Sequence, residues 1–167
     1  FRSVYRGDGK LQPMGQVAEL LDLDSPLKVG LGGRHSGVPF TVMGRLQKSN
    51  GPGTWDEWYL EFEDGRGAWL AESEGEWKLL FPMTNVAPPQ PKLLEPLGTF
   101  QLRDKTFVVE ERNTATTLSA QGQLPAFNAQ HRYVDATGPK GVFCTLDEAD
   151  GTVEALDRKS TRLNSSH

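Results

Sequence analysis

This chain contains one cysteine, Cys144, so no internal disulfide can form. Of its three histidines, only His35 and His131 lie outside the terminal segment, too few for a His/Cys metal site. No apolar run approaches the roughly 20 residues that cross a bilayer. We therefore expect no disulfide framework, no bound metal or cofactor, and no direct insertion into a membrane.

A basic surplus is also missing, because 18 Lys and Arg residues stand against 22 Asp and Glu residues, a net charge of −4. The basic residues are scattered and form no stripe along one segment. A mildly acidic protein repels phosphate groups, which argues against nucleic acid and anionic membrane surfaces as partners. The lone cysteine fits a reducing compartment, and we expect a cytoplasmic protein.

What the chain does contain is a series of short alternating segments. Phe40 to Gln47 and Trp55 to Glu63 alternate apolar and polar residues, the pattern of half-buried strands. Turn pairs follow at Asp64-Gly65 and Glu74-Gly75, and intervals this short leave no room for crossover helices, which predicts an antiparallel sheet. The apolar face of the second segment consists of Trp58, Leu60 and Phe62.

The second half of the chain repeats the first. Phe107-Val108-Val109 with Arg112 matches Phe40-Thr41-Val42 with Arg45 at an offset of 67, and Tyr133, Gly141 and Phe143 match Tyr59, Gly67 and Trp69 at an offset of 74. Between the halves, Ala87 to Pro96 carries four prolines and no periodicity, which predicts an extended linker.

The fold class we predict is all-β, with two tandem small antiparallel sheet or partial-barrel units related by an internal repeat. The expected parts are an N-terminal fragment (1–26, with a short strand at Val17 to Leu23), a first β repeat (27–84), the Pro-rich linker (85–96), a second β repeat (97–156) and a disordered tail (157–167).

Three patterns that could carry chemistry have simpler explanations. Carboxylates crowd the region from Asp56 to Glu76, but most fall on outward strand positions or in turns, unlike the fixed pair of a glycosidase. Gly30 to Gly33 precedes a proline and a strand, whereas a phosphate-binding loop needs a helix. Cys144 could meet His131 as nucleophile and base, but its neighbours form a core-like strand. A Gly-x-Ser-x-Gly motif is missing, and we predict no catalytic residues.

The tryptophans allow two interpretations. All four lie between Trp55 and Leu80, where they could line a groove for a peptide or a sugar, or fill the core of a short-stranded sheet. We favour the core for the cluster as a whole, although Trp55 and Tyr59 have the parity opposite to Trp58. The residues expected to bind a partner are Trp55, Tyr59, Arg34, His35 and Gln123, with the glycine loop Gly32 to Gly37.

Several motifs together resemble the bacterial family of domain of unknown function 4178. They are SPLKVG, FTVMGRLQ, WDEWYLEFEDGRGAWL and the later GQLP with Tyr133-Val134-Asp135, and the resemblance covers Gly15 to Leu156. The resemblance implies no catalytic residues, and relatives often carry a Cys-x-x-Cys zinc-ribbon-like segment ahead of this region. The family more often has an acid where Gln121 and Gln123 stand, which weakens the idea that acids there bind a cation.

Both ends of the chain look truncated. Asp157 to His167 resembles the translation of a common sequencing-library adapter, and Phe1 begins within a strand-like run. We therefore interpret the chain as an internal fragment of a longer bacterial protein.

The function we expect is a non-catalytic protein-interaction module with an unidentified protein partner. The alternative is a small-ligand or peptide-binding domain with a cleft between the two repeats, covered by Gln121 to Asn128, and an enzyme of unknown class comes third. An exposed apolar patch without a pocket would favour the first. A concave site of roughly 300 Å³ or more with converging polar groups would favour the second. A strongly perturbed ionisable residue in such a site would favour the third.

Overall fold

The computed structural model describes residues 12–14 and 26–161, so the predicted short strand at Val17 to Leu23 lies outside the described residues. The described chain forms an eleven-stranded sheet in which every pairing is antiparallel, and this confirms the predicted all-β class. The strands are β1 (Gln12–Met14), β2 (Gly32–His35), β3 (Val38–Ser49), β4 (Thr54–Phe62), β5 (Gly67–Ser73), β6 (Glu76–Pro82), β7 (Thr99–Leu102), β8 (Lys105–Leu124), β9 (Gln130–Thr137), β10 (Phe143–Ala149) and β11 (Thr152–Thr161). Two 3₁₀ turns, η1 (Pro91–Leu93) and η2 (Pro139–Gly141), connect them.

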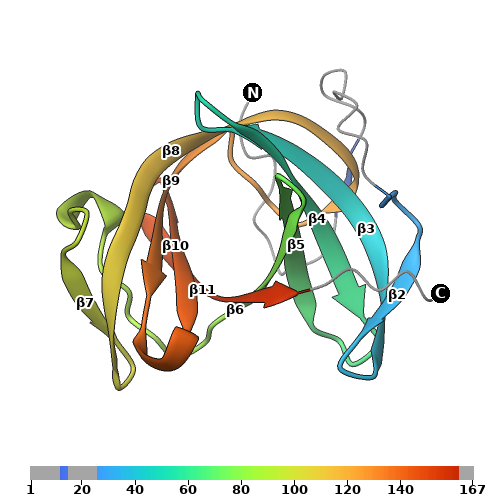
Figure 1. The fold of residues 1–167 in the computed structure, drawn as a ribbon. Coiled ribbons are helices and arrows are strands. Elements are labelled where there is room, and N and C mark those ends of the chain that lie inside the picture. Colours follow the sequence, from blue (N-terminus) through green and yellow to red (C-terminus); the bar gives the residue numbers. More distant parts are fainter. Residues whose placement is uncertain (1–11, 15–25, 162–167) are drawn as a thin grey trace.

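Eight of the strands close into a barrel. Their order is β3-β4-β5-β6-β11-β10-β9-β8, and β8 pairs back onto β3. Figure 1 shows β3 and β8 arching over the top while β6 and β11 cross the lower side. We expected two separate small units, but the β3–β8 and β6–β11 pairings join the two halves along both seams, because each strand at a seam finds its missing hydrogen-bond partner in the other half.

Each half follows the same plan, a five-strand antiparallel meander. The first half pairs β2 to β6 in sequence and the second pairs β7 to β11 in sequence. The last hairpins turn at Glu74-Gly75 and Asp150-Gly151, and all four of these residues have positive φ. That is the type I′ geometry, whose twist matches the flanking strands, as the first of these turn pairs predicted.

The ladders also define which positions of the two halves correspond. A bulge interrupts β3 at Val42–Gly44 and β8 at Val109–Glu111, the predicted offset of 67. Just after the bulge, β3 pairs with Tyr59 and β8 pairs with Asp135, an offset of 76. The predicted offset of 74, which matched Tyr59 to Tyr133, is therefore wrong by two residues. Because a strand repeats every two residues, both tyrosines still face the same side.

The two largest apolar clusters lie on the outer face of the barrel. The predicted apolar face of β4 is buried in the first cluster, and the segment around Leu27 and Leu31 covers it. In the second half, the equivalent face is covered by β7 and by Leu94, which lies just after η1. The predicted linker, Ala87 to Pro96, thus packs against the second half. Because these clusters use one face of each strand, the opposite face is left to line the interior.

The last strand runs further than expected. Asp157 to Thr161, which we predicted to begin a disordered tail, continue β11 and pair with β6. Residues 162–167 lie outside the described residues. Five of the six paired positions between β11 and β6 lie in the segment from Asp157 to Thr161, so it forms most of that seam of the barrel.

Candidate functional site

A cavity of about 570 Å³ lies inside the barrel, between its two halves. Strand alternation builds it: Trp69 and Ala71 of β5 line the cavity, whereas Ala68 and Leu70 point into the outer cluster. Phe127, from the loop after β8, completes part of the wall. An eight-stranded barrel encloses enough space for one small ligand when its inward side chains leave room.

One side of the cavity is apolar and aromatic. Leu46, Leu124 and Phe127 form a buried cluster against which Tyr59 and Trp69 pack. The rings of these last two residues are 5.1 Å apart and tilted, a favourable aromatic geometry. This wall offers apolar and π surface to anything inside the barrel.

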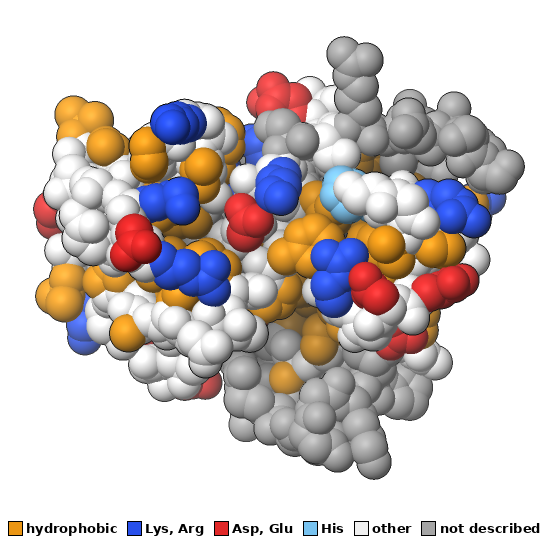
Figure 2. Space-filling model, turned by 90° about the horizontal axis from the view of Figure 1, so that it is seen from below, with side chains coloured by type: hydrophobic (Ala, Val, Ile, Leu, Met, Phe, Trp, Pro, Cys, Tyr) orange, Lys and Arg blue, Asp and Glu red, His pale blue; other side chains and the backbone are white. Residues whose placement is uncertain are grey.

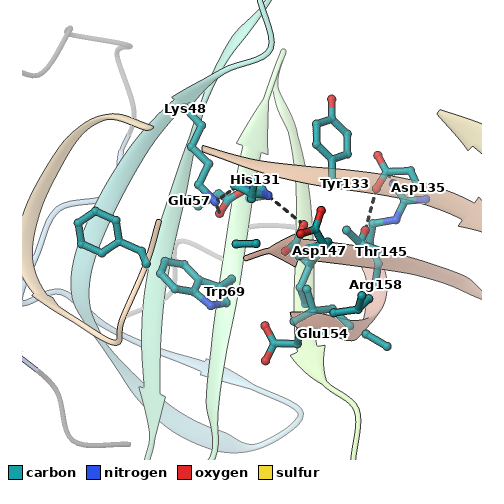
Figure 3. Close-up of a pocket in the computed structure, with 18 of the residues that line it drawn as sticks. Lys48, Glu57, Trp69, His131, Tyr133, Asp135, Thr145, Asp147, Glu154 and Arg158 are labelled. Carbon is teal, nitrogen blue, oxygen red and sulfur yellow. Dashed lines mark hydrogen bonds and ion pairs between the residues drawn. The ribbon is translucent and has the colours of Figure 1, made fainter. Parts of the chain in front are cut away.

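The other side carries a chain of charged groups. Lys48 Nζ lies 2.7 Å from Glu57 Oε1 and 3.0 Å from His131 Nε2, and His131 Nδ1 lies 3.3 Å from Asp147 Oδ1. Figure 3 shows these four side chains in a row above Trp69. They come from β4, β3, β9 and β10, so the row crosses from the first half of the barrel to the second.

The contact with Lys48 sets the hydrogen-bond roles of the two His131 ring nitrogens. An ammonium group has no acceptor, so its contact with His131 requires a lone pair on Nε2 and places the ring proton on Nδ1. That nitrogen is buried and not aligned for a hydrogen bond, although Asp147 is nearby. Burial alone would raise the pKa of Asp147, but the neighbouring His131 and the charge of Lys48 outweigh it and hold the pKa below its ordinary value.

A second polar group surrounds Tyr133. Its hydroxyl donates to Glu111 Oε2 at 3.0 Å and accepts from Asn50 Nδ2 at 3.1 Å. Burial, and then the hydrogen bond and charge of Glu111, raise the pKa of Tyr133 above its ordinary value although the Asn50 contact opposes the shift. The phenol is therefore a neutral donor at physiological pH. Trp55 packs edge-on against the Tyr133 ring at 6.2 Å and donates its indole N–H to Glu57.

Asp135 stands deeper on the same wall. It accepts a hydrogen bond of 2.8 Å from Thr145 Oγ1 and lies 3.5 Å from Arg158 of β11. Burial raises its pKa, against the opposing charge of Arg158 and the Thr145 bond. Two carboxylates of one cavity, Asp135 and Asp147, thus have pKa values displaced in opposite directions.

The structure separates the residues that we predicted to bind a partner. Trp55 lines the cavity, and Tyr59 packs against Trp69 beside it. Arg34 is exposed and closes the β2–β3 turn on Gly37, and Gln123 is exposed near the end of β8. His35 lies in a separate hollow with Phe62 and Phe81, where burial, then Lys159 and Arg66, lower its pKa. The glycine loop and the two aromatic residues therefore do not form one surface.

The sequence reasoning missed most of the charged row. Glu57 was counted among surface carboxylates, and Lys48 and Asp147 were not singled out. The sequence did contain an indication of Lys48. It lies two residues after Leu46 in one strand, so the two side chains must point to the same face. The acidic region does contain buried members, since Asp56 is fully buried with its carboxylate 2.8 Å from Arg45 on the outer side.

Cys144 lies in the outer cluster of the second half, as predicted for a core residue. Its partner position in β9 is Ala136, and it has the parity opposite to the cavity-lining Asp147, whose ion pair is with His131. Burial, far more than nearby charges, raises the pKa of the thiol to about 12. A thiolate–imidazole pair is therefore not formed here. Among the described residues, no cluster of three or more His, Cys, Asp or Glu side chains could hold a metal ion.

Fold and site together define a class: a closed antiparallel barrel with two outer cores and a polar-walled interior cavity. The chain belongs to the family described as Domain of unknown function (DUF4178), whose model matches residues 28–160. This confirms the predicted family and nearly its predicted extent. Neither the curated proteins nor the solved structures contain a match to the chain. None of the helices in the described part of the chain is long and apolar enough to span a membrane.

Proposed function

We propose that this domain binds a small organic molecule inside the barrel. The observation that carries the proposal is the cavity of about 570 Å³, with an aromatic wall facing a row of converging polar groups. Binding sites for small molecules are concave, largely preformed and of this size, with a few polar groups that fix orientation. This was the alternative function in the sequence analysis, and the cavity now favours it over an interaction module.

The arrangement of the cores supports a binding role. A barrel normally fills its interior with the apolar side chains that stabilise it. Here the large clusters lie outside the ring, so the interior carries charged groups such as Lys48 and Asp147 without costing the protein its cores. Burying such groups is expensive unless they have partners or a task. A site for a ligand explains both the space and the charges.

A neutral fluorescent probe tests this proposal. N-phenyl-1-naphthylamine brightens in apolar surroundings, and we expect it to bind the purified domain at one site per chain. Ala71→Trp places a large side chain in the cavity and should lower the affinity at least about tenfold. The control is Thr114→Trp, at an exposed position of β8 outside the cavity. Equal binding by the two variants, or no binding by the parent domain, would overturn the proposal.

A protein-interaction surface is the second candidate. Leu93 and Leu97 are 72% and 84% exposed beside the second half, which is unusual for leucine. Replacing both by serine should abolish recovery of a protein partner in a pull-down while leaving probe binding unchanged. The surface that we first expected, Trp55 and Tyr59, is half-buried toward the interior and fits this role less well.

Two further expectations belong to the proposal. We propose that the halves derive from one five-strand unit, which the shared bulge and the shared hairpin turns support. We also propose a bacterial, cytoplasmic setting, which the family resemblance and the single cysteine support. The side chains that line the cavity do not indicate a particular reaction, so we propose no enzymatic role.

A further inference from the structure

The ligand class can be inferred from the charge of the cavity wall. Six carboxylates line the cavity, against three basic side chains, Lys48, Lys78 and Arg158, and Arg158 lies 3.5 Å from Asp135. The carboxylates are Glu57, Glu111, Asp135, Asp147, Glu148 and Glu154. Figure 2 shows acidic and basic side chains interspersed over the face seen from below. The lining of the cavity is more strongly acidic than this face.

The lysines do not reverse this field. Lys48 is held between Glu57 and His131, so its charge is already matched by a carboxylate at 2.7 Å. Lys78 is partly exposed and lies 3.8 Å from Glu76. Asp147 remains about a third exposed to the cavity, with the imidazole of His131 beside it at 3.3 Å. An anion entering the barrel would meet this carboxylate wall at close range and be repelled.

The opposite wall suits a cation for a different reason. Trp69 lines the cavity on this side, and the negative face of an indole attracts a positive charge. Figure 3 shows Trp69 on one side of the space, with Asp147 and Glu154 on the other. A positive group between them would contact a ring and a carboxylate together, in an interior where charges are poorly screened.

A second observation points to a polar ligand group. The Nδ1 atom of His131 is buried and has no aligned hydrogen-bond partner among the described residues, although the imidazole faces the cavity. Buried donors in native proteins are nearly always satisfied, by protein, water or ligand. An uncharged acceptor atom on the body of a ligand would satisfy it, since an ammonium group carries no acceptor.

We propose that the ligand is an organic cation, an ammonium group carried on an apolar or aromatic body. This inference rests on the proposed function, because it uses the same cavity. The apolar body would lie against Leu46, Trp69 and Phe127, and the ammonium group would lie toward Asp147 and Glu154.

Three probes with one ring system but different charge test the inference. 1-Naphthylmethylamine is a cation at neutral pH, 1-naphthalenemethanol is neutral, and 1-naphthoate is an anion. Each would be titrated against bound N-phenyl-1-naphthylamine at low salt. We expect the amine to displace the dye about tenfold better than the alcohol, and the alcohol better than the anion.

Charge-only variants then locate the effect. Asp147→Asn should weaken the amine about fivefold and change the alcohol less than about twofold, because only the cation loses a charge partner. Glu63→Gln is the matched control, since Glu63 is exposed and outside the cavity.

The outcomes separate the two proposals. If the dye binds but the amine, alcohol and anion compete equally, the domain binds small molecules and the cation inference is wrong. A preference for the anion, or an equal loss in Glu63→Gln, would also reject it. If the dye itself fails to bind, the proposed function fails first.

Discussion

The two halves of the barrel share an apolar outer face and differ on their inner faces. At an offset of 76, Leu70 corresponds to Leu146, and both are buried in the outer clusters. On the inner face, Trp69 corresponds to Thr145 and Ala71 corresponds to Asp147. The remaining inner pairs are Trp55 with His131, Glu57 with Tyr133, and Tyr59 with Asp135.

This difference shows that the outer and inner faces of the barrel have different roles. The outer faces need only be apolar, because they form the cores against β2, β7 and the segments beside them. The inner faces need not be apolar. The first half supplies two tryptophans together with Lys48 and Glu57, and the second supplies most of the carboxylates together with His131. A ligand between the halves would contact both kinds of surface.

The largest expected effect tests whether the outer cores are equivalent. Leu70→Ala and Leu146→Ala each remove a buried side chain, and each should lower the free energy of unfolding by about 2–5 kcal/mol. Because both seams join the halves, denaturation followed by fluorescence and circular dichroism should show one transition in either variant. Leu118→Ala, at 39% exposed, should cost under about 1 kcal/mol. Two separate transitions would mean that the halves fold independently.

The next effect tests the link between the inner faces. Lys48→Met leaves Glu57 and His131 without their shared partner and should cost about 3 kcal/mol, since an uncompensated buried charge remains. The double variant Lys48→Met/Glu57→Gln should recover much of that loss. Lys78→Met removes an exposed pair and should change chemical stability in urea by less than about 1 kcal/mol. If Lys48→Met and Lys78→Met lowered the free energy of unfolding equally, the charged row would stabilise the protein no more than an exposed ion pair does.

A smaller effect concerns the polar half alone. Tyr133→Phe removes two hydrogen bonds and should cost about 1 kcal/mol at pH 7. The folded-state pKa of Tyr133 is raised above its ordinary value of 10.0, so the unfolded chain loses its proton first as pH rises. The stability of the parent is therefore complete below pH 10 and falls above it, and this fall should be shallower in Tyr133→Phe. Parallel urea-midpoint profiles from pH 8 to 11 would contradict this assignment.

The smallest effect compares the two last hairpins. Gly75 and Gly151 both have positive φ, so alanine at either position should cost about 1 kcal/mol, equally in the two halves. Gly53→Ala, where the backbone has no positive φ, is the control and should cost less. A large difference between Gly75→Ala and Gly151→Ala in thermal melting would show that the two turns are not equivalent.

Strand alternation allowed the sequence to predict the local structure but not the closure. The apolar parity of Trp58, Leu60 and Phe62 and the turn at Glu74-Gly75 were sufficient to predict β4 to β6. Closure depends on pairing between strands far apart in the chain, and here it uses Gly44 against Gly122, whose missing side chains let β3 and β8 approach. Nothing local marks those two glycines as partners.

The site was harder to predict for a related reason. Side chains on either face of a strand recur every two residues, so the sequence places Lys48 on the same face as Leu46. It does not show whether that face meets solvent or the interior of a barrel. We expected the polar face to be wet because polar residues usually lie outside. The closed ring reverses this: acids such as Asp135 point inward, while the apolar face is buried by added segments on the outside.

The central claim is that a small organic cation binds inside the ring and not at the outer cores, and the four tryptophans report on this directly. Trp55 and Trp69 line the cavity, whereas Trp58 and Trp77 belong to the outer cluster. In two-dimensional ¹H–¹⁵N spectra titrated with 1-naphthylmethylamine, the indole N–H signals of Trp55 and Trp69 should shift and saturate while those of Trp58 and Trp77 stay in place. Shifts confined to Trp58 and Trp77, or no shift at any indole, would contradict the account.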